Sequence, residues 1–149
     1  MADTQGSFRP IPAEECLVLL RSQVIGRIGW TDDDGLQLLP VTYALHDRTI
    51  VFRTSPYGPL AGLHRQQPAV FEVDAFDAST RTGWSVVVHG RARGITDPGD
   101  LVAVWRAKDP VPWAPGTRNL FIAVTLDQIT GRTVVAGTPP EWLATDQAD

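Results

Sequence analysis

Residues 50–63 read IVFRTSPYGPLAGL, a short apolar run followed by hydroxyl side chains, two prolines and two glycines. The pattern predicts a buried strand that ends near Arg53 and Thr54 and passes through a tight turn into a helix starting at Pro59. Such a turn presents hydroxyl and backbone N–H groups to one place, as anion sites do. An ordinary strand-to-helix turn built from favourable turn residues explains the same pattern equally well.

The composition is that of one globular domain. The chain has 149 residues, of which 43% are hydrophobic and 20% charged, enough for a single core. Its net charge of −4 and its scattered lysines and arginines argue against nucleic acid or a membrane surface as a partner. We see neither a signal peptide nor a membrane-spanning stretch, and the single Cys16 suits a reducing compartment. We therefore expect a cytoplasmic protein.

Hydrophobic periodicity predicts a mainly β (α+β) fold. We expect a flexible N-terminal tail over residues 1–11, a folded domain over 12–136 and a C-terminal tail over 137–149. The expected strands cover residues 24–31, 36–45, 49–54, 69–78, 84–95, 120–126 and 133–136, with short helices over 12–21, 59–66 and 97–108. Short connections favour antiparallel pairing, so we predict a six- to seven-stranded antiparallel split β-barrel with short flanking helices.

Individual residues refine this picture. Asp32–Gly35 predicts a hairpin turn, and Thr130–Arg132 is expected to be another turn. Pro40 interrupts a predicted strand, and because proline cannot donate to a ladder, it predicts an edge, a bulge or a break. Backbone groups that do not bond to a neighbouring strand are available to a flat polar ligand. In strand 84–95, the small residues Gly90 and Ala92 predict the close approach of another element or of a ligand.

The common catalytic signatures of hydrolases, phosphate loops and dinucleotide sites are absent from the sequence. The three histidines are dispersed, so no metal site is expected and no catalytic residue is assigned. Glu72 and Asp74 share one face of a predicted strand, which acid–base chemistry could use. A solvated strand face explains this pair more simply.

The order of several short motifs resembles the pyridoxamine 5'-phosphate oxidase-like proteins, the FMN-binding split barrels. The resemblance covers about residues 12 to 136 and depends on the order and spacing of the motifs together. They are Glu15-x-Leu17-x-x-Leu20, Gly26-Arg27-Ile28, Pro40-Val41-Thr42-Tyr43, Ile50-x-Phe52-Arg53-Thr54, Phe71-x-Val73-Asp74, Gly83-Trp84-Ser85-Val86-x-Val88-x-Gly90-x-Ala92 and Ile129-Thr130-Gly131-Arg132.

The resemblance implies a homodimer with FMN at the interface between two barrels, and a small-molecule substrate. Pro40, Val41 and Thr42 would contact the flavin ring through backbone groups. The phosphate and ribityl chain would be held by Arg53, Thr54 and Ser55, with Gly58 allowing close approach of the backbone. Trp84 and Ser85 would lie near the flavin, and part of the site would come from the partner subunit. At Pro59 the family usually carries a lysine or arginine.

Two classes of function follow from the resemblance. The first is an FMN-dependent oxidoreductase, in which the flavin supplies the chemistry and the protein supplies orientation and electrostatics. The second is a non-enzymatic split barrel that carries flavin, deazaflavin or haem, or that keeps the fold with no cofactor. The proline at position 59 favours the second class.

Overall fold

The computed structural model describes residues 6–107, 111–112 and 118–137. Its strands are β1 (Ser7–Pro10), β2 (Ile25–Asp32), β3 (Gly35–His46), β4 (Thr49–Thr54), β5 (Gln67–Asp77), β6 (Thr82–Gly94), β7 (Leu120–Thr125) and β8 (Gln128–Val135). The helical segments are α1 (Ala13–Ser22), α2 (Pro98–Ala107) and the short 3-10 helix η1 (Ala61–His64).

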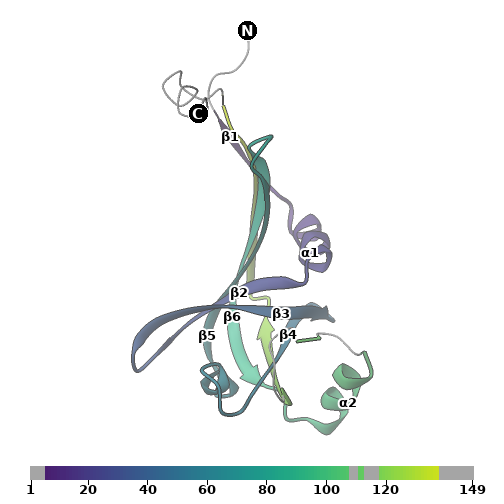
Figure 1. Ribbon diagram of the computed structural model, residues 1–149. Coiled ribbons are helices and arrows are strands. Elements are labelled where there is room, and N and C mark those ends of the chain that lie inside the picture. Colours follow the sequence, from purple (N-terminus) through teal and green to yellow (C-terminus); the bar gives the residue numbers. More distant parts are fainter. Residues whose placement is uncertain (1–5, 108–110, 113–117, 138–149) are drawn as a thin grey trace.

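Six antiparallel strands close a barrel in the order β6-β5-β2-β3-β4-β7, and β7 pairs again with β6. The predicted mainly β split barrel is therefore confirmed, with β8 and β1 added outside the closed ring. Beyond the barrel, the long β5–β6 hairpin continues together with β8 and β1 as an extended sheet (Figure 1). We call this extension, residues 7–10, 73–89 and 128–135, the arm.

Strand β6 belongs to both parts. Its residues 82–89 pair with β8 in the arm, and its residues 92–94 pair with β7 in the barrel. Val86, Val88 and Ala92 are fully buried and form its inward face. At Gly90 an added Cβ would lie 1.8 Å from the carbonyl oxygen of Thr125. The small residue therefore allows the close approach of β7 that closes the barrel.

Local sequence signals account for several turns and helix ends. The Asp32–Gly35 hairpin turn is confirmed: the Asp34 N–H donates to Asp32 Oδ1 at 2.8 Å, and Gly35 has a φ of 107°. This positive φ is one that glycine adopts at little cost. Helix α2 begins after Asp97, whose Oδ2 accepts a hydrogen bond from the Asp100 N–H at 3.0 Å. That contact is an N-terminal cap of the expected kind.

Part of the predicted N-terminal tail is a strand. Residues 7–10 form β1, which pairs antiparallel with β8 from Ser7 opposite Val135 to Pro10 opposite Arg132. The sequence expectation missed it because the four residues are exposed and carry no alternating apolar pattern. Most of the predicted C-terminal tail, residues 138–149, lies outside the described residues.

Two other expectations are wrong. Instead of a helix over residues 59–66, the chain forms a turn followed by the four-residue η1, which leaves no helix start at Pro59. The turn expected at Thr130–Arg132 is also absent, since β8 runs straight through it. Gly131 instead makes room for α1, because an added Cβ would lie 2.6 Å from Cys16 Sγ. The connection between β7 and β8 lies at residues 126–127.

Within the described ranges, none of the helices has the length and apolar character needed to cross a membrane.

Candidate functional site

A cavity of about 460 Å³ opens beside β3 and the end of β4. This is within the range of small-molecule sites, about 300 to 1,000 Å³. We call it the barrel pocket. Its described lining residues are Ile25, Leu39, Pro40, Val41, Thr42, Arg53, Thr54, Pro59, Leu60, Pro112 and Arg118. Five of the nine residues predicted to bind a cofactor thus line one cavity.

One rim of the barrel pocket is the segment of β3 that contains Pro40. The strand is not broken there: Pro40 and Val41 stay in register with Arg27 and Gly26 of β2. On its other side, β3 pairs with β4 from Tyr43 to His46. Pro40 therefore lies in the part of β3 that lines the cavity, where its missing N–H does not interrupt the β3–β4 ladder. This agrees with the edge position that the proline predicts.

At the end of β4, Arg53 and Thr54 form the polar part of the pocket. The Arg53 Nε donates a hydrogen bond of 2.9 Å to the carbonyl oxygen of Arg118, and its guanidinium lies 5.2 Å from the centroid of the Phe121 ring. These two contacts fix the orientation of the guanidinium. Thr54 is 1% exposed, so its hydroxyl lies inside the protein rather than in bulk water.

The turn after β4 is held by hydrogen bonds between its own residues. The Tyr57 N–H donates to Ser55 Oγ at 3.2 Å, and the Gly58 N–H donates to the Ser55 carbonyl oxygen at 3.2 Å. Ser55 and Gly58 are next to the barrel pocket in sequence but are not among its described lining residues. With no α-helix beginning here, the helix-terminus part of the predicted anion site is not formed.

Trp84 and Ser85 lie on the arm, away from the described wall of the barrel pocket. Trp84 is partly buried and packs against the main hydrophobic core. Ser85 lines a separate cavity of about 200 Å³ with Val87, Thr130, Gly131 and Arg132. One copy of the chain therefore divides the predicted site residues between two places.

Arg118 is the charged residue among the described lining residues that sequence reasoning missed. It joins the pocket because β7 pairs with β4 in a register that sets Phe121 opposite Arg53 and Leu120 opposite Thr54. The two arginines are 65 positions apart, and no motif surrounds Arg118. The pairing of the last barrel strand is the signal that brings them together, and it could not be read from local periodicity.

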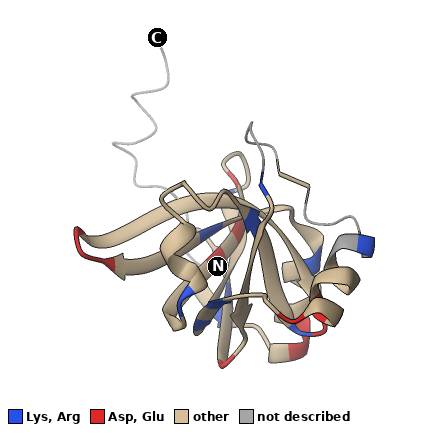
Figure 2. Ribbon diagram, turned by 90° about the horizontal axis from the view of Figure 1, so that it is seen from below, with Lys and Arg blue, Asp and Glu red and all other residues tan. Residues whose placement is uncertain are grey.

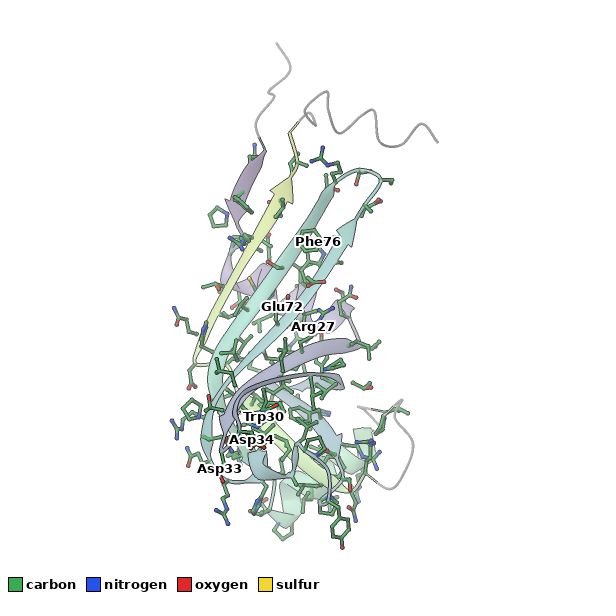
Figure 3. The ribbon with its side chains drawn as sticks, turned by 60° about the vertical axis from the view of Figure 1, so that its left-hand side comes forward. Arg27, Trp30, Asp33, Asp34, Glu72 and Phe76 are labelled. Atoms are coloured by element: carbon green, nitrogen blue, oxygen red, sulfur yellow. The ribbon has the colours of Figure 1, made fainter. Side chains whose placement is uncertain are left out.

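A charged cluster lies close to the same rim, where the arm meets the barrel. Arg27 Nη1 is 3.5 Å from Glu72 Oε1 and 3.3 Å from Asp74 Oδ2, and Figure 3 shows Arg27 and Glu72 side by side, with Phe76 further along the arm. Burial raises the pKa of Glu72 to about 7, with smaller contributions from Asp74, while Arg27 acts in the opposite direction. Arg27 is the cross-strand partner of Pro40, so the cluster lies one strand away from the β3 rim of the pocket.

Acidic and basic residues are otherwise interspersed over the ribbon, with acidic residues at the tip of the β2–β3 hairpin (Figure 2). Over the part of the chain that the structure describes, no three histidine, cysteine or acidic residues come together as a metal site would require.

Comparisons with known proteins agree with this architecture. A FAD binding protein from Mycobacterium smegmatis is 35% identical, over 87% of this chain and 100% of that chain, with a TM-score of 0.75. A FAD-binding protein from Mesorhizobium loti, 22% identical over 87% of this chain and 98% of that chain, shares the fold with a TM-score of 0.70. An uncharacterized protein of Mycobacterium tuberculosis is 28% identical over 128 residues, 83% of each chain. The family model described as pyridoxamine 5'-phosphate oxidase matches residues 12–133, and the chain therefore belongs to this family.

Proposed function

We propose that the protein is a flavin-dependent oxidoreductase that binds FMN in the barrel pocket, acts on a small molecule and works as a homodimer. The observation that carries the proposal is the convergence of Pro40–Thr42 and Arg53–Thr54 on one cavity. These two segments are the ones that the family resemblance assigns to the flavin ring and to its phosphate.

The residues of the pocket fit a flavin in their chemistry. The β3 rim is apolar in its side chains, through Leu39, Pro40 and Val41, and offers backbone polar groups to a planar ring. The pocket also carries the Arg53 guanidinium and the buried Thr54 hydroxyl, which suit a phosphate. A largely apolar cavity with a few convergent polar groups is typical of cofactor sites.

The protein's part in the reaction would be to bind and orient. When bound, the flavin supplies hydride and electron transfer. Arg53, fixed by its contacts with Arg118 and Phe121, would hold the phosphate end in place, while the β3 rim would set the plane of the ring. We assign no catalytic side chain, because electrons can pass between the flavin and its substrate without one.

The 35% identical Mycobacterium smegmatis protein, which binds FAD, supports a flavin as the ligand class. The experiment must therefore distinguish FAD binding from FMN binding. The dimer is supported by the division of the predicted site, since Trp84 and Ser85 could complete a pocket if the arm of one copy met the pocket of another. Exposed apolar side chains on the outer strand faces, including Leu38, Val70 and Phe76, would then be covered.

The test is direct titration of the purified full chain with FMN, FAD, riboflavin and a deazaflavin, followed by absorbance and by the melting temperature. We expect FMN to bind with a saturable rise in melting temperature. The bound flavin should then be reduced by a nicotinamide donor and reoxidised by an acceptor over many cycles. Binding without turnover would identify a carrier instead of an oxidoreductase. If no flavin or deazaflavin changes either readout, the proposal is wrong.

A further inference from the structure

The barrel pocket has a charge pattern that the family motifs do not describe. Its described lining includes two charged residues, Arg53 and Arg118, and both are cationic. They reach it from different strand ends, since Arg53 lies in β4 and Arg118 precedes β7. In a chain of net charge −4, two cations on the wall of one cavity mark it as selective for an anion.

The two arginines are held together by the backbone of one of them. The carbonyl oxygen of Arg118 accepts the 2.9 Å hydrogen bond from Arg53 Nε, and β4–β7 pairing begins two residues later with Leu120 opposite Thr54. Both residues are partly buried, so their attraction for an anion in the pocket is screened less by salt than it would be on the surface. An anion bound beside both guanidinium groups would gain charge-assisted contacts.

We infer that Arg118 is a specificity-determining residue which, together with Arg53, forms a paired cationic site for the phosphate of a phosphorylated ligand. The inference rests on the proposed flavin site and deepens it. The ligand class is a phosphate ester, FMN in the first instance. An unphosphorylated flavin would use the apolar β3 rim alone and gain little from Arg118.

Arg118 has two roles: its backbone carbonyl orients Arg53, and its side chain would contact the anion. A substitution can change the second role and keep the first. Arg53 is oriented by the backbone carbonyl of Arg118, and an alanine at this position keeps that carbonyl. The Arg118→Ala variant should therefore remove one positive charge while Arg53 stays in place. Arg118→Lys keeps the charge but loses the planar guanidinium, and it serves as the conservative variant. Arg21→Ala, at an exposed position on α1, is the matched control for loss of an arginine elsewhere.

The experiment compares the dissociation constants of FMN and riboflavin for the wild-type protein and these variants, with the melting temperature as a check on folding. We expect Arg118→Ala to weaken FMN binding by about 10- to 100-fold and to change riboflavin binding by less than about threefold. Arg118→Lys should recover part of the loss for FMN. Arg21→Ala should bind both flavins as the wild type does.

Three results would overturn the inference: equal losses for FMN and riboflavin, unchanged FMN binding in Arg118→Ala, or no recovery by Arg118→Lys. If the wild type binds neither flavin, the proposed function fails, and the cationic pair is then tested with inorganic pyrophosphate. A rise in melting temperature that Arg118→Ala and Arg53→Ala each abolish would still support the pair. The lack of any such rise would overturn it as well.

Discussion

The barrel pocket and the arm are built from the same sheet, yet they differ in what they offer a ligand. The pocket is concave and cationic, and it is lined by strand ends that come together when β7 closes the barrel. The arm presents an open sheet face with the smaller cavity beside Ser85, the Arg27–Glu72–Asp74 cluster at its base and the exposed Phe76. A single copy thus has one larger cavity lined by five of the predicted site residues, and one open sheet face that carries two others.

The difference shows how residues that the resemblance assigns to one site can lie apart in one copy of the chain. Strand β6 runs from the arm into the barrel, so Ser85 and Ala92 lie on one strand but serve two regions. If the predictions of the resemblance hold, the two regions meet between copies rather than within one. Substitutions can test whether the two regions share one core, whether the arm completes the pocket and how the stability of the junction between them responds to pH.

The largest effect is expected from Phe71→Ala. Phe71 is fully buried on β5, pairs with Ile28 and Val88 on the flanking strands and packs edge-on against Tyr43 with ring centroids 5.0 Å apart. Removing the ring should lower the free energy of unfolding by about 3 to 5 kcal/mol. Phe71 belongs to a hydrophobic core that contains residues of both the barrel and the arm. Chemical denaturation should therefore still show one transition.

The matched control is Phe76→Ala, at a side chain that is 57% exposed on the arm. On the isolated chain it should change the free energy of unfolding by no more than about 0.5 kcal/mol. Two separate transitions in Phe71→Ala, or a loss below about 1 kcal/mol, would mean that the pocket and the arm do not depend on a common core.

An intermediate effect is expected from Val87→Arg. Val87 is partly exposed on β6 with Glu72 as its cross-strand partner, so a new arginine can pair with that carboxylate and leave the monomer folded. The bulky cation should nevertheless prevent a second copy from covering the arm. We expect a shift from dimer to monomer in sedimentation and a loss of FMN affinity of about tenfold or more.

For this substitution, Val102→Arg on the exposed side of α2 provides the comparison, at a side chain 49% exposed. It should leave the oligomeric state and FMN affinity unchanged. A monomeric Val87→Arg that binds FMN as tightly as the wild type would show that one barrel suffices, and the arm would then have no part in the site.

The smallest effect concerns the pH dependence of stability through Glu72. Burial raises the pKa of this carboxyl group to about 7, so the folded protein holds the proton more tightly than the unfolded chain does. The stabilising contribution is therefore complete below the ordinary pKa of glutamate, about 4.3, and is lost as the pH rises through about 7. Glu72→Gln should behave like the wild type near pH 5 and become relatively more stable near pH 8.

The difference should reach about 1 kcal/mol, because the Glu72 side chain is 32% exposed and solvent screens part of the effect. Denaturant unfolding at both pH values measures it. Glu14→Gln, at a side chain 83% exposed, serves as the control. If the gap between wild type and Glu72→Gln stays constant, or favours the wild type at high pH, the carboxylate is not destabilised by its place at the junction.

Much of the fold could be predicted because its signals are local. Hydrophobic periodicity predicts the strand over residues 84–95, in which Val86 and Val88 are buried, and Asp32–Gly35 predicts a hairpin through its turn chemistry. Pro40 also predicts an unpaired side of its strand, since a residue without an N–H cannot donate to a neighbouring strand. The motifs of the resemblance also point to five residues that line the barrel pocket.

The parts that could not be predicted depend on distant pairing. Strand β1 has no apolar pattern of its own and forms because β8 offers it an edge. Gly131 looks like a turn residue in isolation, but it is needed for the contact with Cys16 of α1. Arg118 enters the pocket through the register of β7 on β4, which no window of neighbouring residues encodes.

The closure of the barrel by β7 has a consequence for the newly made chain. On the ribosome, β4 and β6 are complete long before residues 120–125 emerge, and β7 is the strand that pairs with both of them. Until then the barrel is open, with two apolar strand edges that could pair with another nascent chain. Its last strand therefore makes the protein vulnerable to aggregation during slow synthesis, and a pause of translation placed just before residue 120 should lower the yield of soluble protein.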